Sequence, residues 1–265
     1  MYILSLLLVI SIHSPIALAN INLTMGIVHY PPRSDQGPPP HGFTIDLVNE
    51  IFKQSKFSPK YTVVNWARSQ VSVANGSIDL ALYMKGVSAS KISDQLDIGK
   101  PIFRSRLCVF YNKSKFPENI TFNRMSDFSG KYMGNLNGSG LEAFFKNNGL
   151  KVVNTSTLSS LFKMLSLGRL DLANADDVSG IHAIFSLGND ASTRIGMLDK
   201  PISVTDIFLA IGKHRADHQI IRKQIEQGMA KILKNGAYKR LLDRLYMGLK
   251  YDESIIPYDS YQIEK

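Results

Sequence analysis

Short apolar runs alternate along the chain with segments in which apolar residues recur at helical spacing. Such alternation is typical of an α/β architecture with parallel strands. Asn65 is a suitable N-cap for one of the helices, and the run that ends at Met84 is apolar enough for a largely buried parallel strand. The first series of predicted elements comprises strands over 21–29, 61–64 and 78–84 and helices over 45–56 and 66–75.

A second series of the same order begins after Lys113. Ser139 and Glu142 have the spacing of a capping box, which predicts that a helix begins at Ser139, and Asn147-Asn148-Gly149 is a suitable end for it. The remaining predicted elements are strands over 131–136, 152–154, 170–173 and 204–211 and helices over 157–167, 218–233 and 237–247.

The two series contain a similar segment where the third strand begins. GSIDLALYM, from Gly76, and GRLDLANAD, from Gly168, each lead through an Asp-Leu-Ala sequence into a strand, and this internal repeat predicts two similar lobes. Ligands of parallel sheets bind beyond the carboxyl ends of the strands. Residues 85–91, which follow the first of these strands, therefore lie where a ligand is expected.

The composition is that of a folded protein. The chain has 265 residues, of which 44% are apolar, and this is enough for one large core or two smaller ones. The formal net charge of +9 is spread over the chain, which predicts a basic surface and no nucleic-acid partner. Cys108 is the single cysteine and cannot form an internal disulfide, so we expect it to be buried.

The N-terminal residues have the pattern of a secretory signal peptide. An apolar stretch is followed by Pro15 and by the small-x-small sequence Ala17-Leu18-Ala19, which predicts a signal peptide over 1–19, cleavage after Ala19 and a periplasmic product. A membrane anchor or a buried strand is the alternative, but His13, Ser14 and Pro15 interrupt the run well before it reaches the ~20 apolar residues of a membrane span.

Nine short motifs follow one another through nearly the whole of the mature chain. They are Tyr30-Pro31-Pro32, Gly42-Phe43-x-x-Asp46-Leu47, Trp66, Gly76-x-Ile78-Asp79, Asp97-x-x-x-Pro101, Gly130-Lys131, Gly138-Ser139, Gly168-Arg169-Leu170-Asp171 and Gly236-x-Tyr238. In this order they resemble the periplasmic solute-binding proteins of the polar-amino-acid type, bacterial extracellular solute-binding protein family 3.

The resemblance implies a type II periplasmic binding fold, in which two α/β lobes are joined by two crossover hinge strands, here over 107–111 and 204–211. Lobe 1 would combine 20–112 with 204–265, and lobe 2 would be 113–203. The implied function is capture of a small polar, amino-acid-like molecule between the lobes by hinge bending, followed by delivery to an ABC importer. We expect a monomer.

The resemblance also implies two charged ligand contacts. The family holds a carboxylate with an arginine twelve residues beyond the first repeat aspartate, and Lys91 stands at that position. An acidic group for an ammonium lies five residues beyond the second repeat aspartate, at Asp176. The alternatives are an exposed lysine on a short helix for Lys91 and the N-cap of the next helix for Asp176, although Asp177 could make that cap instead.

Further ligand contacts are implied around these charges. Tyr30 and Trp66 match positions that pack on the solute, with core packing as the alternative. Met84 and Gly86 match ligand-contacting positions, and Ser88 lies in the same turn. In lobe 2, Leu136, Ser139 and Gly140 surround an expected helix N-terminus that would favour an anion, although Ser139 could simply be the cap.

Two other functions use the same architecture. A periplasmic sensory protein that signals to a membrane partner needs the same closing site. An exported dehydratase-like enzyme would use Asp176 or Asp177 as a proton donor, but no catalytic constellation accompanies them, so we predict that the protein is not an enzyme. His29 and His41 lack a third ligand at metal-like spacing, and we predict neither a metal nor a cofactor.

Overall fold

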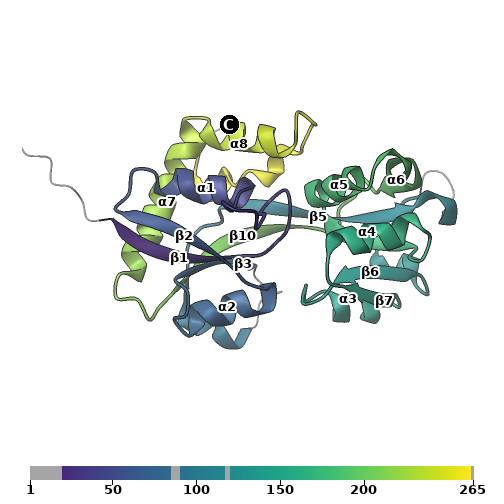
Figure 1. Ribbon diagram of the computed structural model, residues 1–265, viewed down its shortest axis with the longest axis horizontal. Helices are drawn as coiled ribbons and strands as arrows, with labels where there is room; N and C mark the ends of the chain where they lie inside the picture. Colours follow the sequence, from purple (N-terminus) through teal and green to yellow (C-terminus); the bar gives the residue numbers. More distant parts are fainter. Residues whose placement is uncertain (1–19, 85–89, 117–119, 264–265) are drawn as a thin grey trace, which may run out of the picture.

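The computed structural model of the protein describes residues 20–84, 90–116 and 120–263, and within these ranges the chain forms two lobes (Figure 1). Strands β5 (Phe103–Asn112) and β10 (Ser203–Gly212) run through both lobes and pair with each other antiparallel between them. This confirms the two-lobed α/β architecture with two crossover strands. The predicted lobe boundaries, at 112/113 and 203/204, and the signal peptide remain predictions, the latter outside the described residues.

Lobe 1 contains one half of a continuous sheet with the strand order β2-β1-β3-β10. Asn65 caps a helix as predicted, because its side-chain oxygen accepts the N–H of Arg68 at 2.8 Å. The elements of this lobe are β1 (Ile21–Ile27), α1 (Phe43–Phe52), β2 (Phe57–Val63), α2 (Trp66–Ala74), β3 (Leu80–Met84), β4 (Leu96–Ile98), α7 (His218–Lys234) and α8 (Ala237–Leu245).

Lobe 2 contains the other half of the sheet, in the order β5-β8-β6-β7, and β9 pairs with β5. Its elements are β6 (Tyr132–Leu136), α3 (Glu142–Asn147), β7 (Lys151–Thr155), α4 (Leu158–Ser166), β8 (Leu172–Asp176), α5 (Asp177–Ser186), α6 (Asn189–Arg194) and β9 (Ile195–Met197). The predicted strand over 170–173 is thus shifted toward the C-terminus, so that β8 ends at Asp176.

The internal repeat has a structural counterpart in both lobes. Asp79 precedes β3 and accepts the N–H of Thr24 in β1 at 2.7 Å, and Asp171 precedes β8 and accepts the N–H of Tyr132 in β6 at 2.8 Å. Each aspartate therefore fixes the start of its strand against the neighbouring parallel strand. The prediction of two similar lobes is confirmed.

The two repeat aspartates differ in one further contact, and this predicts unequal losses of stability. Asp79 also forms an ion pair with Arg215, with the Oδ1 and Nη1 atoms 2.8 Å apart. We expect Asp171→Ala to lower the free energy of unfolding by about 1 kcal/mol, through loss of one hydrogen bond, and Asp79→Ala to lower it by about 2 kcal/mol. Urea unfolding measures both. Equal losses in the two variants would show that Arg215 contributes nothing.

One predicted helix start is wrong. The helix after Ser139 begins only at Glu142, with Leu141 as an N-cap that makes no side-chain hydrogen bond. Gly138 and Gly140 both have positive φ angles, 75° and 78°, so the backbone on either side of Ser139 cannot be part of a right-handed helix. The Ser139 hydroxyl donates to Asn135 Oδ1 at 2.8 Å instead.

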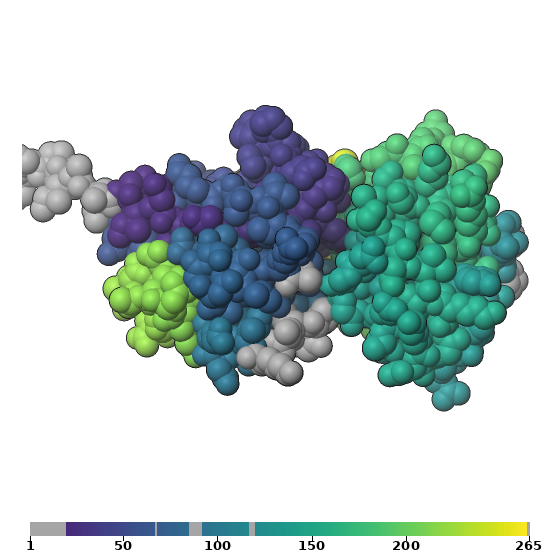
Figure 2. Space-filling view, turned by 60° about the horizontal axis from the view of Figure 1, so that its bottom comes forward, coloured from purple at the N-terminus to yellow at the C-terminus, as the bar shows by residue number. Residues whose placement is uncertain are grey.

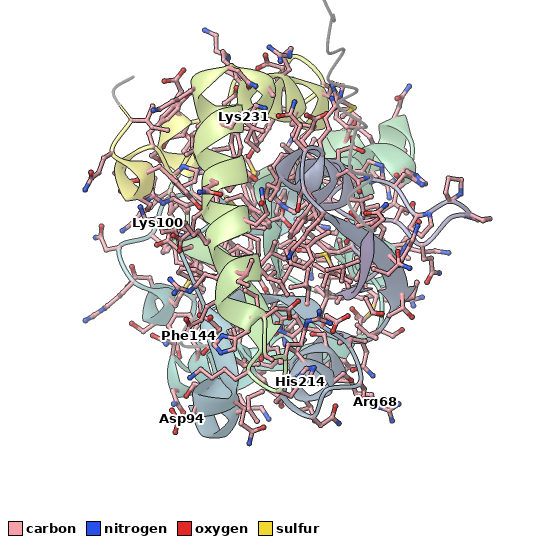
Figure 3. The ribbon with its side chains drawn as sticks, turned by 90° about the vertical axis from the view of Figure 1, so that its left-hand side faces the viewer. Arg68, Asp94, Lys100, Phe144, His214 and Lys231 are labelled. Carbon is pink, nitrogen blue, oxygen red and sulfur yellow. The ribbon has the colours of Figure 1, made fainter. Side chains whose placement is uncertain are left out.

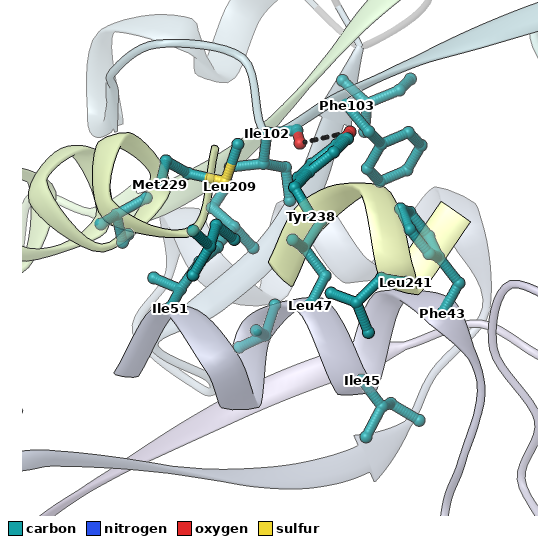
Figure 4. Packing of buried hydrophobic residues seen from close by; sticks show 14 of the residues in the cluster. Phe43, Ile45, Leu47, Ile51, Ile102, Phe103, Leu209, Met229, Tyr238 and Leu241 are labelled. Carbon is teal, nitrogen blue, oxygen red and sulfur yellow. Dashed lines mark hydrogen bonds between the residues drawn. The ribbon is translucent and has the colours of Figure 1, made fainter. Parts of the chain in front are cut away.

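The larger core of lobe 1 lies between its sheet and the helices α1, α7 and α8, and a smaller one packs α2 against β3, β4 and β10. Tyr238 of α8 is 1% exposed, and its hydroxyl donates to the carbonyl oxygen of Ile102 at 3.2 Å (Figure 4). Helix α7 crosses the end of the lobe, with Lys231 near one end of the helix and His214 beyond the other (Figure 3). No helix in the described ranges is long and apolar enough to span a membrane.

Lobe 2 has a separate core on each face of its sheet. In one of them Phe110 and Phe162 pack edge to face, with ring centroids 5.0 Å apart. Cys108 belongs to the same cluster and is buried, as predicted, and burial raises the pKa of its thiol to about 12. This thiol is therefore protonated at neutral pH.

Apolar contacts cross the boundary between the lobes in both directions. Val178 of α5, in lobe 2, belongs to the buried cluster of lobe 1. Tyr30, from the loop after β1, packs against the cluster of lobe 2 that contains Cys108. The space-filling view shows the two lobes side by side (Figure 2). The contacts of Val178 and Tyr30 show that these two residues lie where the lobes meet.

Candidate functional site

The carboxyl ends of two equivalent strands meet at the boundary between the lobes. β3 ends at Met84, which is paired with Ile207 of β10, and β8 ends at Asp176, which is paired with Leu107 of β5. Between these ends, β5 and β10 pair only from Phe103 to Leu107. The two lobes thus direct the carboxyl ends of their parallel strands, where ligands of such sheets commonly bind, toward the same short segment of crossover strand.

The predicted lobe 1 contacts are only partly within the described residues. Trp66 is the first residue of α2 and is partly exposed, and Met84 is partly buried at the end of β3. Lys91 belongs to a short 3-10 helix, Ser90–Gln95, but its side chain lies outside the described part of the chain, as do Gly86 and Ser88. The assignments of Lys91, Gly86 and Ser88 to the site stay predictions.

Asp176 is the N-cap of α5. Its Oδ1 atom accepts the N–H of Ser179 at 3.1 Å, and its side chain is 4% exposed. The cap that the sequence also allowed for Asp177 is therefore made by Asp176, because Asp177 is already the first residue of the helix. Capping alone does not require such deep burial, so the other partners of Asp176 decide its role.

Arg33 of lobe 1 is the ionic partner of Asp176. Its Nε atom donates to Asp176 Oδ1 at 3.1 Å, and the Arg33 side chain is 7% exposed. The guanidinium also lies over the rings of Phe103 and Phe43, 5.2 and 5.9 Å from their centroids. Burial lowers the pKa of Arg33, but its polar neighbours, Asp176 first among them, together more than offset this, so the pKa is raised and the guanidinium stays charged.

Asp177 has partners from three different elements. The hydroxyl of Tyr246, at the end of α8, lies 3.1 Å from both carboxylate oxygens, and Arg106 Nη1 lies 3.7 Å from Oδ2. Arg33 Nη2 lies 4.0 Å from Oδ1. Burial and the neighbouring charge of Asp176 raise the pKa of Asp177. Burial likewise raises the pKa of Tyr246, so its hydroxyl stays protonated and donates.

Tyr30 completes this group from lobe 1. Its hydroxyl accepts the backbone N–H of Asp176 at 3.3 Å, and burial together with the charge of Asp176 raises the pKa of Tyr30 well above its ordinary value. We call Tyr30, Arg33, Arg106, Asp176, Asp177 and Tyr246 the interlobe cluster. Its two guanidinium groups balance its two carboxylates, so the cluster carries no net charge.

A second polar group lies at the carboxyl end of β6. Asn135 Oδ1 accepts hydrogen bonds from Ser139 and from Asn174, at 2.8 and 3.1 Å, and Ser139 and Gly140 line a hollow of about 460 Å³. Leu136 packs against the neighbouring core of lobe 2. Glu142 places a negative charge in the first turn of α3, which opposes binding of an anion at this helix end.

The raised pKa of Asp177 predicts an unusual pH dependence. The pKa of an aspartate is about 4 in the unfolded chain. When the pKa is higher in the folded protein, the group contributes stability at low pH, and this stability is lost as the pH rises from about 4 through the folded-state pKa. We therefore expect the stability deficit of Asp177→Asn, measured by urea unfolding, to be largest near pH 4 and smaller at pH 7. A deficit that grows with pH would contradict this, as an ordinary salt-bridged carboxylate behaves in that way.

Sequence patterns did not identify most of the interlobe cluster. Arg33, Arg106 and Tyr246 were not predicted as site residues, and Asp177 was considered only as a cap or a proton donor. The one available signal was the position of Arg33 directly after Tyr30-Pro31-Pro32, where a cation would lie near the expected ligand. Its pairing with Asp176 joins residues 143 positions apart. The described ranges contain no group of three or more His, Cys, Asp or Glu side chains that could hold a metal ion.

Several solved structures are similar to the protein. A histidine kinase sensor domain with similarity to periplasmic binding proteins is 17% identical with a TM-score of 0.69, covering 85% of this chain and 95% of that one. An ancestral arginine-binding protein bound to arginine is 20% identical with a TM-score of 0.69, covering 86% and 99%. The substrate-binding protein of an amino acid ABC transporter is 17% identical with a TM-score of 0.66, covering 85% and 99%.

At these identities the likeness establishes the fold, which is that of the type II periplasmic binding proteins. None of the curated proteins matches the chain significantly. A family model, by contrast, matches residues 23–248, a range that includes both lobes and both crossover strands. The chain therefore belongs to the bacterial extracellular solute-binding proteins, family 3.

Proposed function

We propose that the protein is exported, captures a small polar, amino-acid-like molecule between its two lobes by hinge closure and delivers it to an ABC importer. The observation that carries this proposal is the convergence of the carboxyl ends of β3 and β8 on the short paired segment of β5 and β10. Bending of that segment would move these carboxyl ends toward each other.

The proposed contacts come from both lobes. Tyr30, Trp66 and Met84 would contact the solute from lobe 1, together with Gly86, Ser88 and Lys91. Leu136, Ser139, Gly140 and Asp176 would contact it from lobe 2. Support for a shared site comes from Tyr30 and Asp176, which already touch across the boundary. The signal peptide over 1–19, with cleavage after Ala19, would deliver the protein to the periplasm.

Ligand capture can be tested on the purified protein. A thermal-shift screen of amino acids, organic acids, sugars, nucleosides and small peptides should give a rise in Tm for at least one class, because a ligand that binds only the folded state stabilises it by mass action. Small-angle X-ray scattering should then show a smaller radius of gyration with that solute. A rise in Tm without compaction would contradict hinge closure.

A sensory role is the second candidate, and the similarity to a histidine kinase sensor domain favours it. Transport and sensing require the same capture step but different membrane partners, an ABC permease or a signalling protein. Uptake of the identified solute, labelled and supplied to cells with and without the chain, separates the two. A dehydratase-like activity would instead appear as turnover of that solute by the purified protein, and we expect none.

A further inference from the structure

Within the interlobe cluster, the two arginines compensate the two carboxylates, so no negative charge is left for a ligand. Asp176 and Asp177 are both nearly inaccessible, with side chains 4% and 3% exposed, and Arg33 and Arg106 supply two opposite charges within 4.0 Å of them. A buried carboxylate attracts a cation strongly only while its charge is uncompensated. Here the compensation comes from the chain itself.

Arg33 is also fixed in place by contacts other than the ion pair. Its guanidinium packs over the rings of Phe43 and Phe103, which also contact each other, and the loop that carries it is closed by reciprocal backbone contacts between Tyr30 and Ser34. A ligand cation that took Asp176 would have to displace this buried guanidinium, and within the cluster Arg33 and Arg106 would then share Asp177 as their counter-ion. Such an exchange is unfavourable because it leaves an excess positive charge in a low-dielectric site.

We infer that Arg33 occupies, from within the chain, the place beside Asp176 that a cationic group of a ligand would take, so that the captured solute carries no ammonium or other positive group. This inference rests on the proposed function and narrows its ligand class to neutral or anionic polar molecules. It also makes Arg33 a residue that determines specificity. Arg33 was not among the predicted ligand contacts, but its side chain contacts one of them, Asp176.

The test compares solutes that differ only in the ammonium group. Alanine, glutamate and phenylalanine are each paired with the 2-hydroxy acid of the same side chain: lactate, 2-hydroxyglutarate and phenyllactate. Binding is measured by calorimetry and thermal shift on the wild type, Arg33→Met, Asp176→Asn and the double variant R33M/D176N. Circular dichroism checks that each variant is folded.

We expect the wild type to bind no amino acid better than its hydroxy acid. Arg33→Met, which frees the Asp176 carboxylate, should shift the preference at least tenfold toward an amino acid, and the shift should vanish in R33M/D176N. A folded Arg33→Met that gains no such preference would overturn the inference. The inference would also be overturned if the wild type bound an amino acid at least tenfold more tightly than its hydroxy acid and lost this preference in Asp176→Asn. That outcome does not require Arg33→Met to fold.

Failure of the proposed function has a different signature. It would appear as a wild type that is stabilised by no solute class in the broad screen. The preference gained by Arg33→Met could still be measured in that case, because it depends on the freed carboxylate and not on the natural solute.

Discussion

Replacing Asp176 by alanine is expected to lower the free energy of unfolding by about 3–5 kcal/mol, the cost typical of removing one partner of a buried ion pair. The substitution leaves Arg33 buried without the oxygen that its Nε atom contacts at 3.1 Å. It also removes the cap of α5, which adds about 1 kcal/mol. Urea unfolding monitored by circular dichroism measures the loss.

A double variant serves as the control for this prediction. R33M/D176N removes both charges together and keeps side chains of similar length, so it should be much closer to the wild type than the sum of its single variants. We expect a coupling energy of at least about 2 kcal/mol. Additive losses, or a loss below about 1 kcal/mol in Asp176→Ala, would mean that water replaces the ion pair.

Because loss of Asp176 is expected to destabilise the protein, a weaker affinity in an Asp176 variant does not by itself show that Asp176 contacts the ligand. If Asp176 bound a ligand ammonium directly, its removal would weaken binding without a large effect on the unliganded protein. With Arg33 as its partner, the same substitution disturbs the boundary between the lobes before any ligand is added. Stability and affinity therefore need to be measured on the same variants.

Much of the fold could be predicted because its signals are local. Asn65 caps α2 through its own side chain, and the repeated Gly-x-hydrophobic-Asp segments mark equivalent strand starts in both lobes. Boundaries were less certain where backbone conformation overrides side-chain preference. Ser139 has the right spacing for a cap, but the positive φ angles of Gly138 and Gly140 keep it out of the helix.

The site could be predicted only where the family pattern points to a residue. The position of Asp176 follows from its distance to the repeat aspartate, and the structure gives it the capping role that the sequence had left as the alternative. Its ionic partner could not be found in this way. Arg33 and Asp176 meet only because the loop after β1 reaches the boundary between the lobes, and a single sequence contains no record of such a long-range contact.

The second large effect is expected at Gly228 of α7. This residue is buried where α7 crosses α1, and a Cβ atom there would clash with the carbonyl oxygen of Ile51 and lie 3.0 Å from its carbonyl carbon. We expect Gly228→Val to lower the free energy of unfolding by about 3 kcal/mol, because the obstacle is backbone and no rotamer change can relieve it. Urea unfolding again gives the value.

The result is informative because helix propensity predicts the opposite sign. Glycine is among the least favourable residues inside a helix, so valine would stabilise α7 by a few tenths of a kcal/mol if packing did not matter. Gln227→Val is the matched control, since the neighbouring position on the same helix is exposed. We expect it to change stability by less than about 0.5 kcal/mol. If both variants were equally stable, α7 would have to move away from α1 at little cost, and the close contact of these helices would not hold lobe 1 together.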